Sequence, residues 1–413
     1  MAKRPLGLGK AAKNKKHKSD EGQEASNELT VELSEEIDAN DDIGQLKALW
    51  TTYTKSDRDN ELVVNGVIHE CDRILRNNDS NNELPDVFHA IYSLALSELA
   101  NFHPQEVEEY FQAAMERVDI GLSKYPESIE CLIAKTKILI RKFSLQYVAK
   151  LDLESEFEHD LSKLVDEICN NYEIIESLAE KNNRIDIFNQ DNLSILVDFI
   201  DILDIIDHFG QDEEDEDEDE ELEPVDLPEN HPLYKIRNNN TYKLWWRDHM
   251  ITFLKYVDSQ LQNLSIKLED EYEKSDDETH VLIPLRRQIC SRIGQSFLQQ
   301  SEIPSSIFTT LTYDEDYQDK QELDGLSREE SRTQAQDLIL SGLKYLKWAK
   351  KFDDPETWVS EAEAMISLGN LYEVDSEEQE NHYQLAENLL KKANNVTNGK
   401  YDDILENLRG GEE

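Results

Sequence analysis

Apolar side chains recur every three or four residues over most of the chain from Gly44 onwards. This spacing places them along one face of an α-helix, so it predicts a series of amphipathic helices. The expected helices cover residues 46–53, 62–75, 87–99, 110–122, 129–139, 161–178, 193–209, 244–261, 282–300, 331–351, 356–372, 381–395 and 402–408. Short connections between such helices favour antiparallel neighbours, and we therefore expect an all-α fold of antiparallel helix pairs.

Small residues at particular positions indicate that these pairs are repeats of the tetratricopeptide kind. That repeat has Leu-Gly-x-x-Tyr on its first helix and Ala-x-x-x-Phe on its second, because small side chains let the helices approach closely. Degenerate fragments of this pattern occur three times at irregular spacing, and their expected packing residues are Gly369, Tyr372 and Ala386; Gly294, Phe297 and Ala335; and Ala114, Val118 and Pro126. The fragments favour tetratricopeptide-like repeats in an elongated array, with an ordinary helical bundle as the alternative.

An unbroken block of acidic residues, Asp212–Glu221, divides the helical pattern into two halves. Like charges at this density repel one another and cannot be buried, so the block is expected to be an extended linker. The expected organisation is a disordered tail at 1–43, helical repeats at 44–210, an acidic linker at 211–230, a second helical repeat region at 231–409 with a polar loop at about 309–331, and a disordered end at 410–413.

The composition agrees with this fold and restricts the class of partner. The 14 Gly and 10 Pro residues are few for 413 residues, which disfavours an architecture of many strands and turns. With 90 acidic and 43 basic side chains, the net charge of -47 repels polyanions, so direct nucleic-acid binding is not expected. No apolar run is long enough for a membrane span. The four scattered cysteines lack the spacing of a metal site or a disulfide framework, which favours buried free thiols in an intracellular protein.

The first eighteen residues differ in charge from the rest of the chain, because they contain basic side chains and no acidic one. The basic residues are Lys3, Arg4, Lys10, Lys13, Lys15, Lys16 and Lys18. A compact group of this kind is typical of a nuclear import signal, in which acidic pockets of an importin receptor hold the lysines. An arm for nucleic acid or the ribosome and a solvated tail without a partner are the alternatives.

Candidate chemistry is sparse. The sequence contains no phosphate-binding, metalloprotease or nucleophile motif, so we expect no catalytic, cofactor-binding or metal-binding residue. His69 and Cys71 are two positions apart on an expected helix and therefore point to different faces. The aspartates that recur every third residue from Asp198 to Asp207 spread around their helix, which favours a solvated acidic face over a cation site. The neighbouring tryptophans at 245 and 246 are expected to pack between helices rather than to hold a ligand.

Two stretches resemble a known family. Residues Lys3–Lys10 read KRPLGLGK and precede the lysine group, and residues Gly121–Ser128 read GLSKYPES. With the acidic block and the overall length, they make the chain similar to the fungal enhancer-of-translation-termination family. The resemblance implies an all-α, nuclear, non-catalytic partner of a 2-oxoglutarate- and iron-dependent prolyl hydroxylase that modifies a ribosomal protein. It also implies an indirect link to the ribosome and to termination factors, with low stop-codon readthrough, and oxygen-linked regulation of gene expression.

The resemblance assigns the iron and the 2-oxoglutarate to the hydroxylase and places no ligand residue in this chain. The acidic block supports a second hypothesis, an acidic chaperone or import adaptor that shields basic cargo such as histones or ribosomal proteins. A third is contact between the basic tail and ribosomal RNA, which would depend strongly on salt. The chaperone needs only the charge, whereas the hydroxylase adaptor needs the helices, and tandem helical repeats therefore favour the adaptor.

Overall fold

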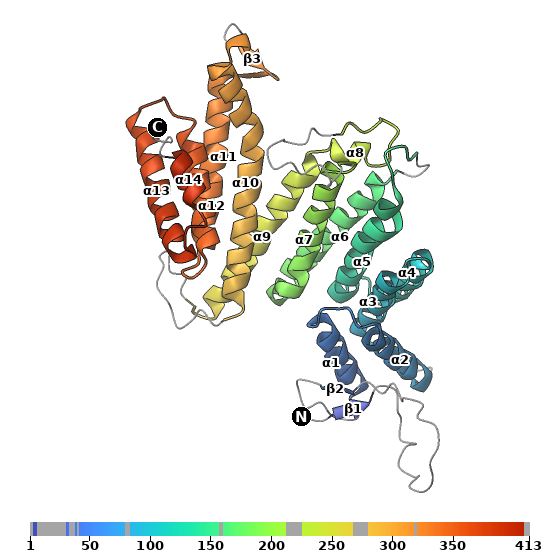
Figure 1. The fold of residues 1–413 in the computed structure, drawn as a ribbon. Helices are drawn as coiled ribbons and strands as arrows, with labels where there is room; N and C mark the ends of the chain where they lie inside the picture. The colour runs from blue at the N-terminus through green and yellow to red at the C-terminus, as the bar shows by residue number, and fades with distance from the viewer. Residues whose placement is uncertain are drawn as a thin grey trace, which may run out of the picture. The chain divides into compact units, whose positions relative to one another are not determined.

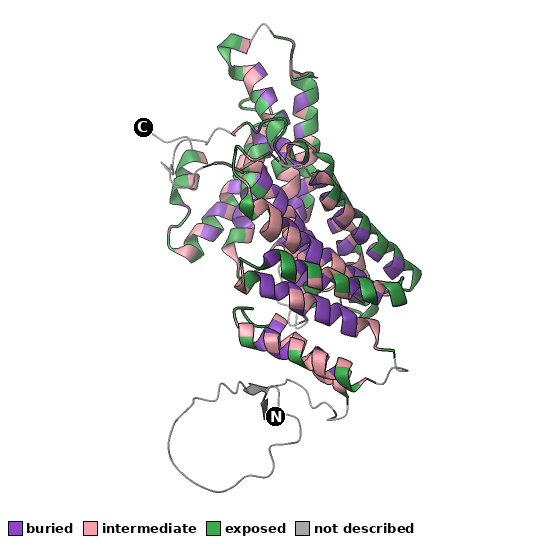
Figure 2. Ribbon diagram, turned by 90° about the vertical axis from the view of Figure 1, so that its right-hand side faces the viewer, coloured by how far each residue is buried: buried purple, intermediate pink, exposed green. Residues whose placement is uncertain are grey.

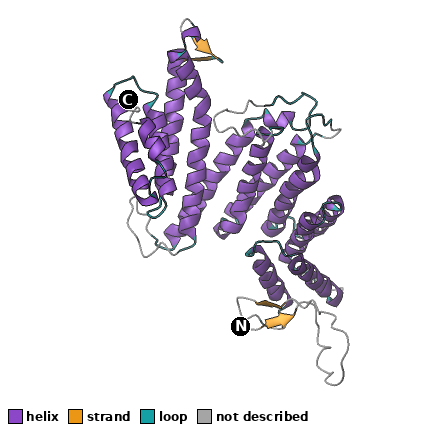
Figure 3. Ribbon diagram, viewed as in Figure 1, coloured by secondary structure: helices purple, strands orange, loops and turns teal. Residues whose placement is uncertain are grey.

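The computed structural model describes residues 3–5, 30–32, 38, 41–78, 83–156, 160–211, 225–266, 280–317 and 320–408. Helices dominate these ranges, and the strands in them form two short antiparallel pairs (Figure 3). The expected all-α class is therefore confirmed. In the described part of the chain, no helix is both long enough and apolar enough to cross a membrane.

The chain divides into two compact units. The first comprises Met1–Arg184 and Val197–Asn240, and the second comprises Ile185–Leu196 and Thr241–Glu413. The elements of the first unit are β1 (Lys3–Pro5), β2 (Thr30–Glu32), α1 (Asp42–Thr54), α2 (Glu61–Asn77), α3 (Asp86–Phe102), α4 (Val107–Lys124), α5 (Ile129–Lys142), a π-helical turn (Phe143–Tyr147), α6 (Ser162–Lys181), most of α7 (Gln190–Asp207) and α8 (Tyr234–Arg237) (Figure 1). The strands β1 and β2 pair antiparallel, so the described residues of the range 1–43, which was expected to lack structure, include a strand pair.

Local sequence determines where several of these helices begin. Asp41, Asn60 and Ser128 are N-cap residues, and their side-chain oxygens accept backbone N–H groups in the first turns of α1, α2 and α5. Helix α3 packs against α2, α4 and α5, and most of its residues are buried, including Phe88 and Ala95. The other helices combine a buried and an exposed face, as the periodicity predicts (Figure 2).

The second unit consists of helices that follow one another as antiparallel neighbours. Its elements are a 3₁₀ turn (Ile185–Ile187), the first turns of α7, α9 (Thr241–Asn263), α10 (Leu282–Tyr313), β3 (Glu322–Leu323), β4 (Leu326–Ser327), α11 (Arg328–Ala349), α12 (Pro355–Gly369), α13 (Glu377–Thr397) and α14 (Asp402–Leu408). Helices α10 and α11 pack along each other, as do α12 and α13. A continuous core joins α11, α12, α13 and α14.

Caps also set the starts of α11 and α12. Ser327 and Glu330 form a reciprocal capping box, in which each side chain accepts the other residue's backbone N–H. The Asp354 carboxylate accepts the Glu356 backbone N–H, and Pro355 occupies the first helical position, where its missing N–H is not needed. Both starts lie within three residues of the starts that the periodicity predicts.

The segment between α10 and α11 differs from the expected polar loop at 309–331. Helix α10 continues through Pro304 to Tyr313, well past the expected end of this helix. The strands β3 and β4 then pair, with Leu323 opposite Leu326. Asp324 and Gly325 form the two-residue turn, and both have positive φ angles, 50° and 80°. An Asp-Gly pair is a strong hairpin signal, so the sequence does contain the information for this turn.

Candidate functional site

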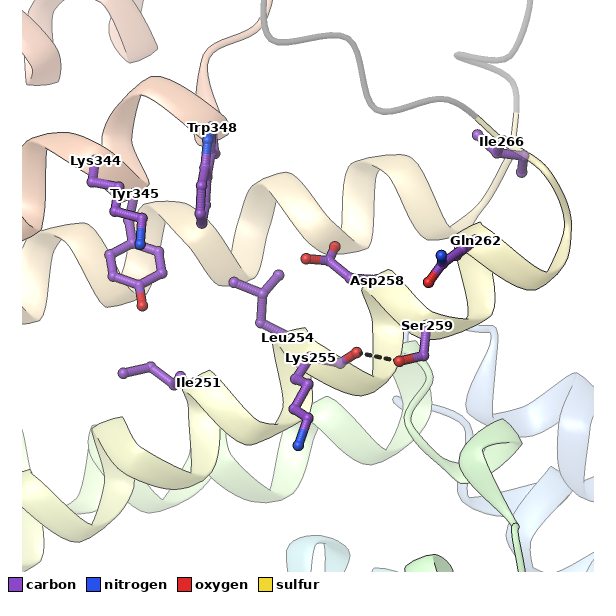
Figure 4. Close-up of a pocket in the computed structure, with 10 residues that line it drawn as sticks. All are labelled: Ile251, Leu254, Lys255, Asp258, Ser259, Gln262, Ile266, Lys344, Tyr345 and Trp348. Atoms are coloured by element: carbon purple, nitrogen blue, oxygen red, sulfur yellow. Dashed lines mark hydrogen bonds between the residues drawn. The ribbon is translucent and has the colours of Figure 1, made fainter.

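A groove in the second unit lies between α9 and α11, with a cavity volume of about 520 Å³. Its lining residues are Ile251, Leu254, Lys255, Asp258, Ser259, Gln262 and Ile266 from α9 and the turn after it, and Lys344, Tyr345 and Trp348 from α11 (Figure 4). The α9 residues recur at steps of three and four, so they form one stripe on the helix. At 1.5 Å per residue, the stripe from 251 to 262 is about 17 Å long. The groove therefore follows α9 for about three turns.

Two aromatic rings form the α11 wall of this groove. Tyr345 and Trp348 point from α11 toward α9 (Figure 4), and their ring centroids are 5.5 Å apart at an interplanar angle of 86°. This edge-to-face arrangement suits the quadrupoles of the rings. Phe297 of α10 stacks on Tyr345 with a centroid distance of 5.9 Å, and the Arg247 guanidinium lies 4.1 Å from the Phe297 ring centroid. Neighbouring side chains thus hold the wall in place.

The groove offers positive charge in a chain that is strongly acidic overall. Asp258 is neutralised, because Arg286 Nε donates a hydrogen bond to its carboxylate at 2.7 Å. The Arg286 guanidinium also lies 5.3 Å from the Trp348 ring centroid. Lys344 Nζ lies 5.0 Å from the same centroid. Among the described residues, neither Lys344 nor Lys255 forms an ion pair with a carboxylate. The Lys344 ammonium lies beside the aromatic wall, whereas Lys255 belongs to the α9 side of the groove.

Glycines bring α10 and α11 together beside this groove. A Cβ on Gly294 would lie 2.7 Å from Leu346 Cγ, and a Cβ on Gly342 would lie 3.0 Å from the Gly294 carbonyl oxygen. Of the other residues expected in this repeat, Ala335 is fully buried on α11, and Phe297 is half-buried. Sequence reasoning selected Gly294 but missed Gly342, because a single sequence does not reveal which residue lies opposite on the next helix.

A glycine also lies at the contact between α12 and α13. A Cβ on Gly369 would lie 2.6 Å from Tyr383 Cε1. Tyr372 stacks on His382 with ring centroids 5.5 Å apart, and Ala386 is fully buried on α13. The three residues expected to pack in this fragment therefore lie at or near one helix-helix contact.

The third fragment lies in the first unit and makes its close contact through another residue. Ala114 and Val118 are fully buried on α4, whereas Pro126 is exposed in the turn before α5. The close approach occurs at Gly121, where a Cβ would lie 2.7 Å from His89 Cβ. Gly121 belongs to the stretch that carries the family resemblance, and this close packing explains why that stretch has a glycine here.

His89 is buried without a hydrogen-bond partner. The residue is 2% exposed, and neither ring nitrogen has a partner among the described residues. Burial lowers the pKa of His89 to about 4, and the positive charges of Arg117 and Lys124 act in the same direction. His89 is therefore neutral at physiological pH, and it belongs to the packing of α3 against α4.

A second buried polar group, Glu98, links helices of the first unit. Its side chain is 2% exposed, and Arg141 of α5 forms an ion pair with it at 2.6 Å. The Tyr53 hydroxyl donates a hydrogen bond to Glu98 at 3.1 Å. These contacts join α1, α3 and α5.

The expected nuclear import signal lies mostly outside the described residues. Lys3 and Arg4 belong to strand β1. Lys10, Lys13, Lys15, Lys16 and Lys18 lie outside the described ranges. The import signal therefore stays a prediction.

The remaining sequence candidates do not form a reactive site. No group of His, Cys, Asp and Glu in the described ranges could hold a metal ion. His69 is exposed, whereas Cys71 is buried.

Trp246 is buried, and its Nε1–H donates a hydrogen bond to the Leu196 carbonyl at 2.6 Å. Burial raises the pKa of the Asp198 carboxyl, so this aspartate departs from the solvated face that we expected.

Comparison with known proteins gives consistent matches over the whole chain. The family model described as nuclear pore complex subunit Nro1 matches residues 1–409. The enhancer of translation termination 1 of Scheffersomyces stipitis is 52% identical over 440 residues, which cover 99% of this chain and 100% of that protein. The protein of the same name from Candida albicans strain SC5314 is 51% identical over 437 residues, with coverage of 99% and 100%.

Solved structures resemble the chain in fold. The S. pombe nuclear import adaptor Nro1 superimposes with a TM-score of 0.54 at 16% identity, over 92% of this chain and 100% of that one. A second Nro1 structure, described as a hypoxic regulator of sterol synthesis and a nuclear import adaptor, gives a TM-score of 0.53 at 18% identity, over 89% and 92%. At this level of identity the likeness concerns the helical fold alone.

Proposed function

This chain belongs to the Nro1 family, and from that membership we propose that it is a non-catalytic nuclear adaptor that holds partner proteins on its helices. The match over residues 1–409 is the observation that carries the proposal. The groove between α9 and α11 supports it, because an adaptor needs a preformed surface for a partner.

The partner that we propose is a 2-oxoglutarate- and iron-dependent prolyl hydroxylase, with an importin receptor as a second partner. Binding of the hydroxylase would support efficient translation termination, with low stop-codon readthrough, and would provide oxygen-linked regulation of gene expression. The names of the relatives support the link to termination, and the name of the structural neighbour supports the import role. Iron and 2-oxoglutarate would act in the hydroxylase.

The state of the cysteines supports a role without covalent catalysis. All four are buried and free. Burial raises the pKa of Cys131 to about 11 and that of Cys290 to about 12. Thiols with such pKa values are almost fully protonated at neutral pH and are therefore poor nucleophiles.

Affinity purification of the tagged full-length chain at low salt, followed by mass spectrometry, tests the proposal. We expect the prolyl hydroxylase and an importin receptor among the captured proteins, and neither with the tag alone. Capture of histones or ribosomal proteins without the hydroxylase would overturn the hydroxylase assignment.

The import role has its own test, which uses the basic tail. Replacing Lys13, Lys15, Lys16 and Lys18 with alanine removes the compact lysine group without shortening the chain. We expect the fluorescently tagged variant to lose its nuclear accumulation and to keep its binding of the hydroxylase. Unchanged nuclear accumulation would exclude these lysines as the import signal.

An acidic chaperone for basic cargo is the second candidate, and the unbroken acidic block Asp212–Glu221 favours it. A chaperone of this kind depends on charge density. Replacing the block with a neutral Gly/Ser linker of equal length should then abolish binding of histones or ribosomal proteins. If such binding survives the replacement, the block is not a chaperone surface.

A further inference from the structure

We propose that the groove between α9 and α11 binds an acidic segment of a partner protein, anchored by an aliphatic or aromatic side chain. This inference rests on the proposed adaptor function and assigns the chemistry of one ligand to one surface. It differs from what the net charge of -47 suggests, namely that basic partners are favoured everywhere on the chain.

The shape of the groove favours a peptide over a compact small molecule. Its α9 side is a stripe from Ile251 to Gln262 with Ile266 beyond it, whereas its α11 side is limited to about one turn around Tyr345 and Trp348. A ligand that follows α9 for about 17 Å has the length of about three helical turns. Amphipathic helices that lie in a groove place one apolar side chain per turn on such a stripe.

The apolar contacts favour an anchored segment. Ile251 and Leu254 lie on the α9 side opposite the rings of Tyr345 and Trp348 (Figure 4). Trp348 is half-exposed in the chain by itself, although its ring already packs against Arg286 and Tyr345. A half-buried tryptophan held in a fixed position is well suited to pack on the anchor of a partner, because tryptophans contribute strongly to interface energies.

The charges select an acidic ligand. Directly after α11, Lys350 pairs with Glu361 at 2.6 Å and Lys351 pairs with Asp353 at 3.2 Å. Lys255 and Lys344 line the groove without such a partner among the described residues, and Arg286 already neutralises Asp258. A ligand carboxylate next to the aromatic wall would therefore meet the Lys344 ammonium, and a second carboxylate along the α9 side of the groove would meet Lys255. Neither would meet an unpaired lining carboxylate.

Fluorescence anisotropy on the purified full-length chain tests the assignment. The probe is a labelled amphipathic peptide with leucine and phenylalanine at helical spacing among glutamates. One control peptide replaces the apolar residues with serine, and another replaces the glutamates with glutamine. We expect the first peptide to bind and both control peptides to bind at least tenfold more weakly, which corresponds to about 1.4 kcal/mol.

Charge-reversal variants place the binding site. Lys344→Glu and Lys255→Glu should each weaken binding of the probe at least tenfold, and Trp348→Ala should do the same. Lys347→Glu is the matched control, because Lys347 is an exposed lysine of the same helix that does not line the groove. It should retain binding within about twofold. Circular dichroism and thermal melts of each variant establish that loss of binding is not loss of folding.

Several outcomes would overturn the proposal. Equal binding of the glutamine peptide would exclude selection by charge, and an equal loss with Lys347→Glu would place the site elsewhere. If the chain sediments as a dimer that Trp348→Ala dissociates, a second copy occupies the groove. Hydroxylase capture separates this inference from the adaptor function: capture without peptide binding removes only the groove assignment, whereas peptide binding without capture removes only the hydroxylase assignment.

Discussion

Gly294 of α10 lies against Leu346 of α11 so closely that a Cβ at position 294 would be 2.7 Å from Leu346 Cγ. The same Cβ would be 3.2 Å from the Gly342 carbonyl oxygen. This contact sets the separation of α10 and α11, and it also positions Trp348, which lies on α11 and lines the groove. Helix spacing and groove shape are thus coupled.

Gly294→Ala should destabilise the second unit by up to about 2 kcal/mol. Overpacking in a core costs about 1–3 kcal/mol, and the better helix propensity of alanine offsets about 1 kcal/mol of that amount. Urea unfolding followed by circular dichroism measures the change. Gln295→Ala is the control, because this exposed neighbour has no such contact and should change stability by no more than about 0.5 kcal/mol. Equal effects of the two substitutions would contradict the packing explanation.

Replacing His89 should reduce the acid sensitivity of folding. The pKa of His89 is about 4 in the folded chain, below its ordinary value of 6.5. The unfolded chain therefore takes up this proton first as the pH falls, and stability decreases between pH 6.5 and about 4. Above pH 6.5 the residue is neutral in both states and contributes no pH dependence.

The measurement is the free energy of unfolding at several pH values for the wild type and for His89→Leu. The wild type should lose about 2–3 kcal/mol more than the variant over this window, since each pKa unit corresponds to about 1.4 kcal/mol. Parallel curves for the two proteins would show that His89 does not titrate with the lowered pKa.

Glu98→Ala should destabilise the first unit by about 3 kcal/mol, because it leaves Arg141 without its buried partner. Thermal unfolding measures the loss. The double variant with Arg141→Met should recover part of the stability, since no uncompensated charge then remains. If the double variant loses as much free energy of unfolding as the two single variants together, Glu98 and Arg141 do not stabilise each other.

Shortening the acidic block Asp212–Glu221, or replacing it with a neutral linker, should change the free energy of unfolding by no more than about 0.5 kcal/mol. We expect this because we propose that the block is a linker and not part of either core. Chemical unfolding of the full-length variant measures the effect. A loss of several kcal/mol would mean that the block contributes to the folded structure.

Hydrophobic periodicity was sufficient to predict the main helices, because each helix buries one face, and caps such as Ser327 and Asp354 define their starts. It could not predict the end of α10, since Pro304 usually terminates a helix, whereas this one continues to Tyr313. The hairpin at Asp324-Gly325 carried a readable signal within a segment that we expected to be a loop.

The groove could not be predicted from the sequence. Leu254 and Trp348 line it together, although more than ninety residues separate them along the chain. Neither residue has an unusual local sequence, and their proximity depends on the packing of α9 and α11 around α10. Tertiary contacts between distant helices leave no periodic signal in one sequence. For the same reason, the sequence did not identify Gly342 as a packing residue.

The central claim is that the helices, and not the acidic block, hold the prolyl hydroxylase. Isothermal titration calorimetry of the purified hydroxylase with the full-length chain tests it directly when the wild type is compared with the variant whose Asp212–Glu221 block is a neutral linker. We predict that both bind with dissociation constants that agree within about threefold. Loss of binding in the neutral-linker variant, or no binding by the wild type, would contradict the claim.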